Sequence, residues 1–262
     1  MLTLLINSLA LLFYLMASVY QFMLIKQKYQ RRQEYLLIII ALALAFHALG
    51  VYLLMALDEG IDFGINKMIS LILAVVNCLV LLSSLRKPLH NLFVFLLPLS
   101  IIAIVIALLQ QQPHFIAIGT GVKIHILLSL VAYSLLTIAT LQVLLLGWQN
   151  HQLKSHHLAG AVKLLPPLQT MEQLMYELLW AGVILLTFGI LVGFVYIENL
   201  FAQHLVHKTV LSLLAWSVFI GLLLGKHSFG WRGNTAVKWV LTGFCFLLLA
   251  YFGSKLVLEI IL

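Results

Sequence analysis

Histidines are the side chains in this chain best suited to chemistry. There are ten of them among 262 residues, of which 63% are hydrophobic and only 9% are charged. Four lie within or at the ends of long apolar runs, namely His47, His125, His207 and His227. A histidine is costly in hydrocarbon unless it has a partner, so a histidine within the membrane is a functional candidate by default. Because a neutral imidazole nitrogen binds metals well, the first chemistry to consider is metal ligation.

His125 begins a polar stripe. Ser129, Tyr133, Thr137 and Thr140 follow it at nearly helical spacing. A stripe of this kind in a membrane helix usually faces other helices and not lipid. Two interpretations stay open: a ligand histidine that lines a site between helices, or a packing stripe with a hydrogen-bonded histidine.

His207 is expected at the start of a later helix, at a similar depth to His125. Two imidazoles at one depth on separate helices are suited to binding one haem iron from opposite faces. Lys123 and Lys208 lie beside these histidines in sequence and are suited to pairing with haem propionates. The alternatives are an interfacial histidine in contact with water and lysines that extend to the lipid headgroups.

His47 and His227 are two further candidates. His47 is eleven residues into the second apolar run, roughly 16 Å deep, where it needs either a hydrogen-bond partner such as Asn77 or a metal centre. His227 ends the seventh run, on the opposite side of the membrane from His207. An inner-surface histidine without a ligand is the alternative for His227.

Eight apolar runs must position these side chains. Each is close to the ~20 residues that a helix needs to cross the hydrocarbon layer, and each is too continuously apolar for a barrel strand. The sequence therefore predicts an all-α, polytopic membrane bundle forming a single integral membrane domain, residues 1–262. The apolar runs expected to cross the membrane are residues 2–25, 36–57, 66–85, 89–109, 122–146, 178–197, 209–224 and 236–258.

Basic residues predict the orientation of the bundle. If the loop after the first helix faces the cytoplasm, 11 of the 15 basic residues lie inside, as the positive-inside rule requires. Both termini are then outside, and His125 and His207 lie near the outer face. The inner group is Lys26, Lys28, Arg31, Arg32, Arg86, Lys87, Lys154, Lys163, Lys226, Arg232 and Lys238, and the outer group is Lys67, Lys123, Lys208 and Lys255.

The stretch from Leu164 to Tyr196 organises the second half of the chain. It opens with two prolines, and Thr170 and Gln173 have the spacing of a capping box that starts a helix. Gly182, Gly189 and Gly193 are spaced to lie roughly along one side of that helix. The preceding polar connection, Trp148 to Pro167, is the longest in the chain.

Several functional classes are disfavoured. The sequence contains no HExxH, GxSxG, P-loop or dinucleotide-binding glycine pattern, so we expect no enzyme. The basic residues are spread over short loops, which argues against nucleic-acid binding. Cys78 and Cys245 each lie in an apolar run without a CxxC pair, which argues against thiol chemistry. Carboxylates are nearly absent from the apolar runs, which argues modestly against an ion-coupled transporter.

With these residues in view, the chain resembles the cytochrome c assembly family of haem-handling membrane proteins, and within it the YpjD-like and HemX-like branch. The first half is similar more loosely, through His47 and GIDFGINKMISL. Four segments carry the likeness: His125 with LLSLVAYSLL, the stretch from Leu164 to Tyr196, HKTVLSLLAW from His207, and HSFGWRGNTAVKWVLTGFCFLLLAYFGSKLVLE from His227.

The resemblance implies a multi-pass protein of the bacterial inner membrane that binds haem b non-covalently near the outer face, with residues 122–259 as the haem-handling-like core. His125 matches the first outer histidine of the family, and His47 and His227 match its membrane histidines. In better-known members a tryptophan-rich segment holds the haem, whereas the corresponding loop here, residues 197–208, contains no tryptophan. His207 is a candidate partner for His125 from depth alone.

The expected partners are the lipid bilayer, haem and cytochrome assembly proteins. Two other functions stay open. One is a non-haem regulator or scaffold of tetrapyrrole metabolism, in which the loop 148–167 contacts a cytoplasmic partner. The other is a transporter of small solutes.

Overall fold

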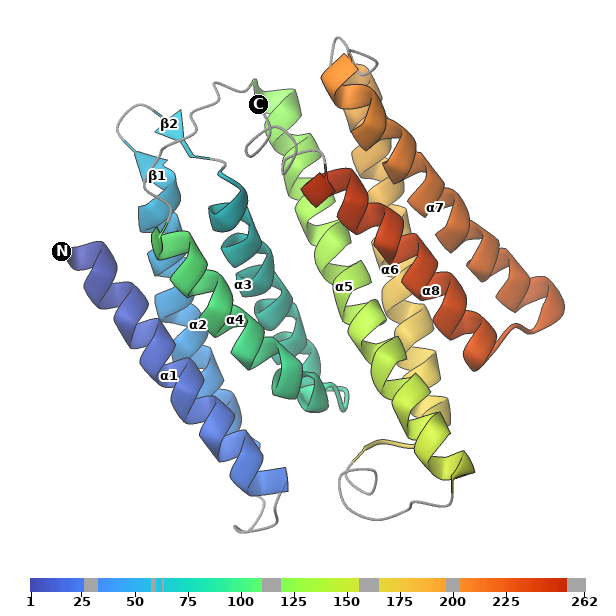
Figure 1. Cartoon of the computed structure of the whole chain (residues 1–262), viewed down its shortest axis with the longest axis horizontal. Helices are drawn as coiled ribbons and strands as arrows, with labels where there is room; N and C mark the ends of the chain where they lie inside the picture. Colours follow the sequence, from blue (N-terminus) through green and yellow to red (C-terminus); the bar gives the residue numbers. More distant parts are fainter. Residues whose placement is uncertain are drawn as a thin grey trace. The chain divides into compact units, whose positions relative to one another are not determined.

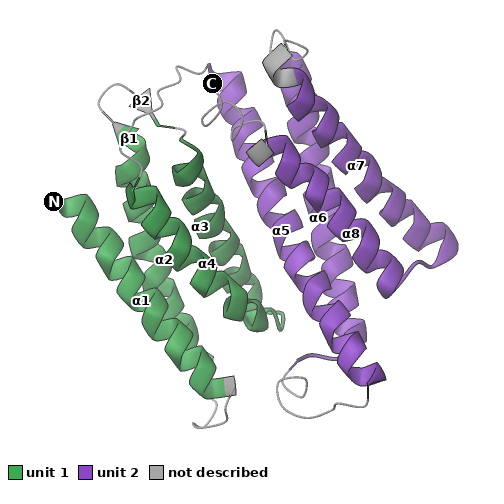
Figure 2. Ribbon diagram, viewed as in Figure 1, with its two compact units in different colours: residues 1–117 green, residues 118–262 purple. Residues whose placement is uncertain are grey.

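The computed structural model describes residues 1–25, 33–57, 60–62, 64–109, 119–155, 165–196 and 203–253. The chain forms two compact units, residues 1–117 and residues 118–262 (Figure 2). The expected haem-handling-like core, residues 122–259, falls within the second unit. Several residues used above to predict orientation, including Lys26, Lys163 and Lys255, lie outside the described residues.

The first unit contains four long helices, and consecutive helices run in opposite directions (Figure 1). Helix α1 packs on α2, α2 on α3, α3 on α4, and α4 returns to α1. A short antiparallel pair joins α2 to α3, and a single 3-10 turn, His90–Leu92, leads into α4. The elements are α1 (Leu2–Ile25), α2 (Gln33–Met55), β1 (Ala56–Leu57), β2 (Gly60–Ile61), α3 (Ile65–Ser84) and α4 (Phe93–Leu109).

The second unit repeats this plan with three longer helices and a shorter last one. Helix α5 packs on α6, α6 on α7, α7 on α8, and α8 returns to α5. The last described residues, Leu249–Gly253, form a π-helical turn that continues α8 and contacts α7. The helices are α5 (Thr120–Lys154), α6 (Leu168–Tyr196), α7 (Gln203–Phe229) and α8 (Asn234–Leu248).

These helices agree with the all-α membrane bundle that the apolar runs predict. Over the described ranges, eight helices are long and apolar enough to cross a membrane. At most 44% of the side chains in the most apolar window of any span are buried inside the protein, so large hydrophobic side chains cover its outer surface. Only a lipid environment removes such a surface from water, and the chain is therefore a multi-pass membrane protein.

Helix α5 ends later than predicted, whereas helix α6 begins close to its predicted start. Helix α5 continues to Lys154 instead of ending near Leu146, so the first part of the predicted connection 148–167 is helical. Helix α6 begins at Leu168, two residues before the predicted helix start at Thr170 and ten residues before the apolar run at Leu178. Hydropathy detects the part of a helix that lies in lipid, whereas the backbone stays helical through the polar turns beyond it. Residues 156–164 lie outside the described residues.

The capping-box interpretation of Thr170 is wrong in detail. The first backbone bond of α6 runs from the amide of Met171 to the carbonyl of Pro167, 3.1 Å away, so Thr170 lies inside the first turn. The side chain of Gln173 bonds forward to Glu177 and not back to a cap. Pro166 and Pro167 are compatible with a helix start, because the first turn leaves its amide groups without helical partners in any case.

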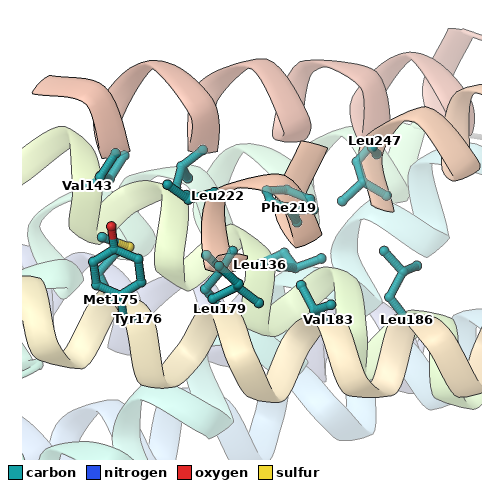
Figure 3. Close-up of a cluster of buried hydrophobic side chains, with 14 of the residues drawn as sticks. Leu136, Val143, Met175, Tyr176, Leu179, Val183, Leu186, Phe219, Leu222 and Leu247 are labelled. Atoms are coloured by element: carbon teal, nitrogen blue, oxygen red, sulfur yellow. The ribbon is translucent and has the colours of Figure 1, made fainter. Parts of the chain in front are cut away.

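The core of the second unit lies where all four of its helices meet (Figure 3). Leu136 and Val143 of α5 pack there with Leu179 of α6, Phe219 of α7 and Leu247 of α8. The three glycines of α6 let α5 approach closely, as their spacing predicts. A Cβ atom built on Gly182 would lie 2.8 Å from the Leu136 side chain, and one on Gly189 would lie 3.2 Å from Ser129 Oγ.

Candidate functional site

His125 lies in the second turn of α5, and its half-buried side chain contacts α6. Its Nδ1 is 2.7 Å from the backbone carbonyl oxygen of Gly189. A carbonyl can only accept a hydrogen bond, so Nδ1 must carry the proton. In the neutral ring, Nε2 then holds a free lone pair, which is the form in which histidine binds metals. Nε2 makes no hydrogen bond to any residue that the structure describes.

A missing side chain on α6 makes room for this ring. A Cβ atom on Gly193 would lie 3.0 Å from both Cε1 and Nδ1 of His125. Gly189 and Gly193 are four residues apart and therefore lie on the same face of α6. One glycine supplies the carbonyl that orients the imidazole, and the other supplies the space that the imidazole occupies.

A cavity of about 90 Å³ opens beside His125, between α5, α6 and α7. Its lining contains both apolar and polar side chains. The apolar surface comes from Leu186, Ile190, Phe194 and Leu213. The polar side chains in its lining are His125, Ser129 and Tyr133 from α5, and Lys208, Thr209 and Ser212 from α7. The cavity thus combines one imidazole, one ammonium group and several hydroxyl groups at one end of the second unit.

The polar stripe predicted along α5 is only partly directed into this cavity. Ser129 and Tyr133 line it, and the hydroxyl of Tyr133 has Ser212 of α7 as a hydrogen-bond partner. Thr137 and Thr140 instead bond to the carbonyls of Tyr133 and Leu136, one turn earlier in their own helix. The structure therefore divides the stripe: its first half forms a cavity wall, and its second half is satisfied within α5.

Lys208 is the lysine of the predicted pair that reaches the cavity. Its ammonium nitrogen lies 5.5 Å from the centre of the Tyr251 ring, close enough for a cation–π interaction. Tyr251 in turn contacts Tyr133 edge to face, with ring centres 6.1 Å apart. These aromatic contacts hold the cation beside the cavity. Lys123 is exposed and is not part of the lining.

His207 is not brought to the cavity. Its side chain is exposed, whereas Lys208, Thr209 and Ser212 of the same helix face the cavity. At 100° per residue, the centre of those three positions lies roughly 150° around α7 from His207. The structure therefore places His125 with Lys208 and leaves His207 on the other side of its helix.

His47 has a different environment, within the first unit. It is completely buried, with Nδ1 3.0 Å from the Tyr14 hydroxyl and Nε2 2.9 Å from Ser70 Oγ. The suggested partner Asn77 instead bonds to Ser100, 2.7 Å away. With both ring nitrogens occupied, His47 joins α1, α2 and α3 and offers no lone pair to a ligand in this arrangement.

His227 is exposed near the end of α7, twenty residues after His207 and so roughly 30 Å along the helix. It therefore cannot share a ligand with the cavity at the start of α7. No cluster of three or more metal-binding side chains occurs in the ranges that the structure covers. A site for a bare metal ion is thus not found there, whereas a haem iron needs only one or two imidazoles from the protein.

Thr209, Ser212 and the carbonyl of Gly189 were not predicted as site groups. Thr209 and Ser212 carry a weak signal, because with Lys208 they recur at helical spacing on one face of α7. The Gly189 carbonyl carries none, since any backbone carbonyl has the same chemistry and only packing against α5 selects this one.

The fold and the site define a class: a multi-pass helical membrane protein with an oriented histidine in a cavity at one end of its bundle. Comparison with known proteins gives the family. The family model described as cytochrome c assembly protein matches residues 3–262, so the chain belongs to the cytochrome c assembly protein family.

Two relatives illustrate this membership. The inner membrane protein YpjD of Escherichia coli K12 is 43% identical over 141 residues, which is 54% of this chain and 53% of YpjD. A protein of Azospirillum brasilense, named for its position in the nifR3-like 5' region, is 33% identical over 188 residues, 69% of each chain. The match thus spans about half the length of YpjD. No solved structure matches the chain.

Proposed function

We propose that this protein binds haem b non-covalently at the His125 cavity of its second unit and handles it at the outer face of the bacterial inner membrane. The observation that carries the proposal is the bond from His125 Nδ1 to the Gly189 carbonyl, which leaves Nε2 available beside a cavity. Family membership supports the same function, since cytochrome c maturation requires haem to reach an apoprotein.

The chain's own residues have distinct roles in this proposal. His125 would supply the iron ligand, and the Gly189 carbonyl would keep its tautomer and ring orientation, as outer-sphere partners do for ligand histidines. Lys208 would pair with a propionate, and Tyr251 would hold the Lys208 ammonium group near the cavity. When bound, haem would supply an iron centre for ligand exchange or electron transfer.

The donor groups fit haem, but the volume is small. Pockets that enclose ligands of this size measure about 300–1,000 Å³, whereas this cavity measures about 90 Å³. The cavity could therefore hold only the part of a haem next to His125, and it does not enclose a whole haem. His207 remains a predicted second ligand, and because its side chain does not line the cavity, the proposal rests on His125 alone.

The charge distribution of the second unit supports an outward location. His125 lies at the end where α5 begins and α7 begins, together with Lys123 and Lys208. Lys154, Lys226, Arg232 and Lys238 lie at the opposite end, where α5 ends and α8 begins. By the positive-inside rule, the end with more basic residues belongs in the cytoplasm.

The absorption spectrum of the purified full chain, oxidised and then reduced, tests the proposal. We expect a Soret band in the wild type that His125→Ala removes, while His227→Ala, which alters an exposed histidine at the other end of α7, leaves the band unchanged. His207→Ala decides whether a second imidazole contributes: a shifted band indicates that it does.

A colourless protein that takes up no added haem would overturn the proposal. Capture of a cytoplasmic partner by such a protein would favour the regulator or scaffold of tetrapyrrole metabolism. Haem-independent uptake of a solute into vesicles would favour a transporter.

A further inference from the structure

A second hollow lies at the opposite end of the second unit, between the end of α5 and the start of α8. It has a volume of about 420 Å³. The side-chain amide nitrogen of Asn150 donates to Asn234 Oδ1 across it, at 3.3 Å, and so links the two helices. Because α5 and α8 both belong to one compact unit, this groove is built within a single bundle.

One half of the groove is cationic. Lys154 of α5 and Lys238 of α8 both line it, and both are exposed. Among the described residues of this end of the unit, no carboxylate lines the groove. The nearby carboxylate of Glu172 is held by Arg232 at 3.2 Å and by the backbone amide of Gly233 at 3.3 Å. The first turn of α8 also faces this end of the unit, and its amide groups add partial positive charge.

The other half is apolar. Leu144 of α5 and Val237 of α8 contribute apolar surface, and Gly147 leaves space between the two helices, since a Cβ there would stay 3.6 Å from Val237. Trp148 lines the groove at the level where α5 changes from apolar to polar, and 41% of its surface is exposed. Tryptophan prefers this position at the membrane–water interface.

We propose that this groove binds the phosphate headgroup of an anionic phospholipid, with the upper part of an acyl chain against Leu144, Gly147 and Val237. The two lysines attract the phosphate, and the apolar half selects a lipid over a free anion. Basic pockets between membrane helices on the cytoplasmic side commonly recognise anionic headgroups. The proposal does not depend on haem, because the groove lies at the other end of the unit from His125.

Lipid binding to the purified full chain tests this site, with native mass spectrometry to compare phosphatidylglycerol and phosphatidylcholine of the same acyl chains. We expect a preference for phosphatidylglycerol that Lys154→Gln/Lys238→Gln reduces by roughly 25-fold, at about fivefold per lysine. The matched control, Arg86→Gln/Lys87→Gln, removes the same charge from exposed positions of the first unit. It should leave the preference intact.

Two further measurements sharpen the test. Gly147→Leu narrows the apolar half and keeps both lysines, so it should weaken lipid binding without changing the net charge. Inorganic phosphate at millimolar concentration should not displace the lipid. Equal binding of the two lipids, an equal loss in the control pair, or displacement by inorganic phosphate would each overturn the proposal.

Discussion

The two units of this protein use the same four-helix plan but treat a histidine in opposite ways. In the first unit, His47 is fully buried, and Tyr14 and Ser70 are hydrogen-bonded to its two ring nitrogens. In the second, His125 has one nitrogen bonded to a backbone carbonyl and the other beside a cavity. A histidine inside a membrane bundle is therefore a structural group when both nitrogens are satisfied. It becomes a candidate metal ligand when only one of its nitrogens is hydrogen-bonded.

Ion pairs differ between the units in the same sense. Asp62 and Lys67 form a buried salt bridge at the start of α3, and the side chains are 0% and 8% exposed. The pair in the second unit, Glu172 with Arg232, lies at the surface, and the Arg232 side chain is 62% exposed. The pair in the first unit is thus shielded from solvent, whereas the pair in the second unit is open to solvent and salt.

The largest loss of stability from a single substitution is expected at the buried salt bridge between Asp62 and Lys67. Lys67→Met leaves the Asp62 carboxylate buried with the Gly64 amide as a remaining partner, and removing one partner of such a pair typically costs about 3–5 kcal/mol. Unfolding in mixed detergent–SDS micelles measures the loss. Replacing both residues, with Lys67→Met/Asp62→Leu, should recover much of it. A Lys67→Met variant as stable as the wild type would contradict the burial of the pair.

The next effect distinguishes the two histidines. His47→Ala leaves the buried hydroxyl groups of Tyr14 and Ser70 without their shared partner, so we expect a loss of about 2 kcal/mol in unfolding free energy. His207→Ala changes an exposed position, so its unfolding free energy should fall by less than about 0.5 kcal/mol, as is usual for surface substitutions. If His47→Ala also removed a Soret band while the protein stayed folded, the structural role assigned to His47 would be wrong.

A smaller loss of stability is expected for a substitution at Gly193, where α6 makes room for the His125 ring. In Gly193→Ala the added methyl group meets the ring at 3.0 Å, so the ring must shift away from the Gly189 carbonyl. Alanine stabilises a helix by about 1 kcal/mol relative to glycine. Overpacking costs about 1–3 kcal/mol, so we expect a net loss of about 1 kcal/mol in unfolding free energy. The control is Gly147→Ala, where the nearest side-chain atom is 3.6 Å away.

For this variant the spectrum is more informative than the stability. If haem binds through His125, Gly193→Ala should shift or weaken the Soret band, and Gly147→Ala should not. An unchanged band with normal haem content in Gly193→Ala would argue against an iron ligand whose orientation depends on α6.

The smallest effect belongs to the surface pair. Arg232→Gln removes an interaction with Glu172 that solvent screens, so we expect a change of less than about 1 kcal/mol. Raising the salt concentration should reduce the difference between wild type and variant further. A loss as large as that of Lys67→Met would remove the contrast drawn between the two units.

Much of the fold follows from local properties of the chain. The first four helices end within a few residues of the predicted positions, because charged residues, glutamines or a proline follow within a few residues of each apolar run. The end of α5 does not lie near its predicted position, because hydropathy changes at the lipid boundary while the backbone hydrogen bonds continue into water. The glycine face of α6 was predictable, since helical spacing alone places Gly182, Gly189 and Gly193 together.

The candidate site was only partly predictable. His125 and Lys208 were predicted, and they line one cavity. His207 was paired with His125 from depth, but depth says nothing about the direction of a side chain around its helix. That direction depends on how α7 packs against α5 and α6, which no feature of the separate helices determines.

The sequence by itself determined that this is a helical membrane protein, because the length and apolarity of each run decide whether its backbone can cross lipid. It also determined which residues carry imidazole and ammonium groups. Only the tertiary structure decided which imidazole keeps a free nitrogen. That outcome depends on neighbours that are distant in sequence, with Gly189 sixty-four residues after His125 and Tyr14 thirty-three before His47.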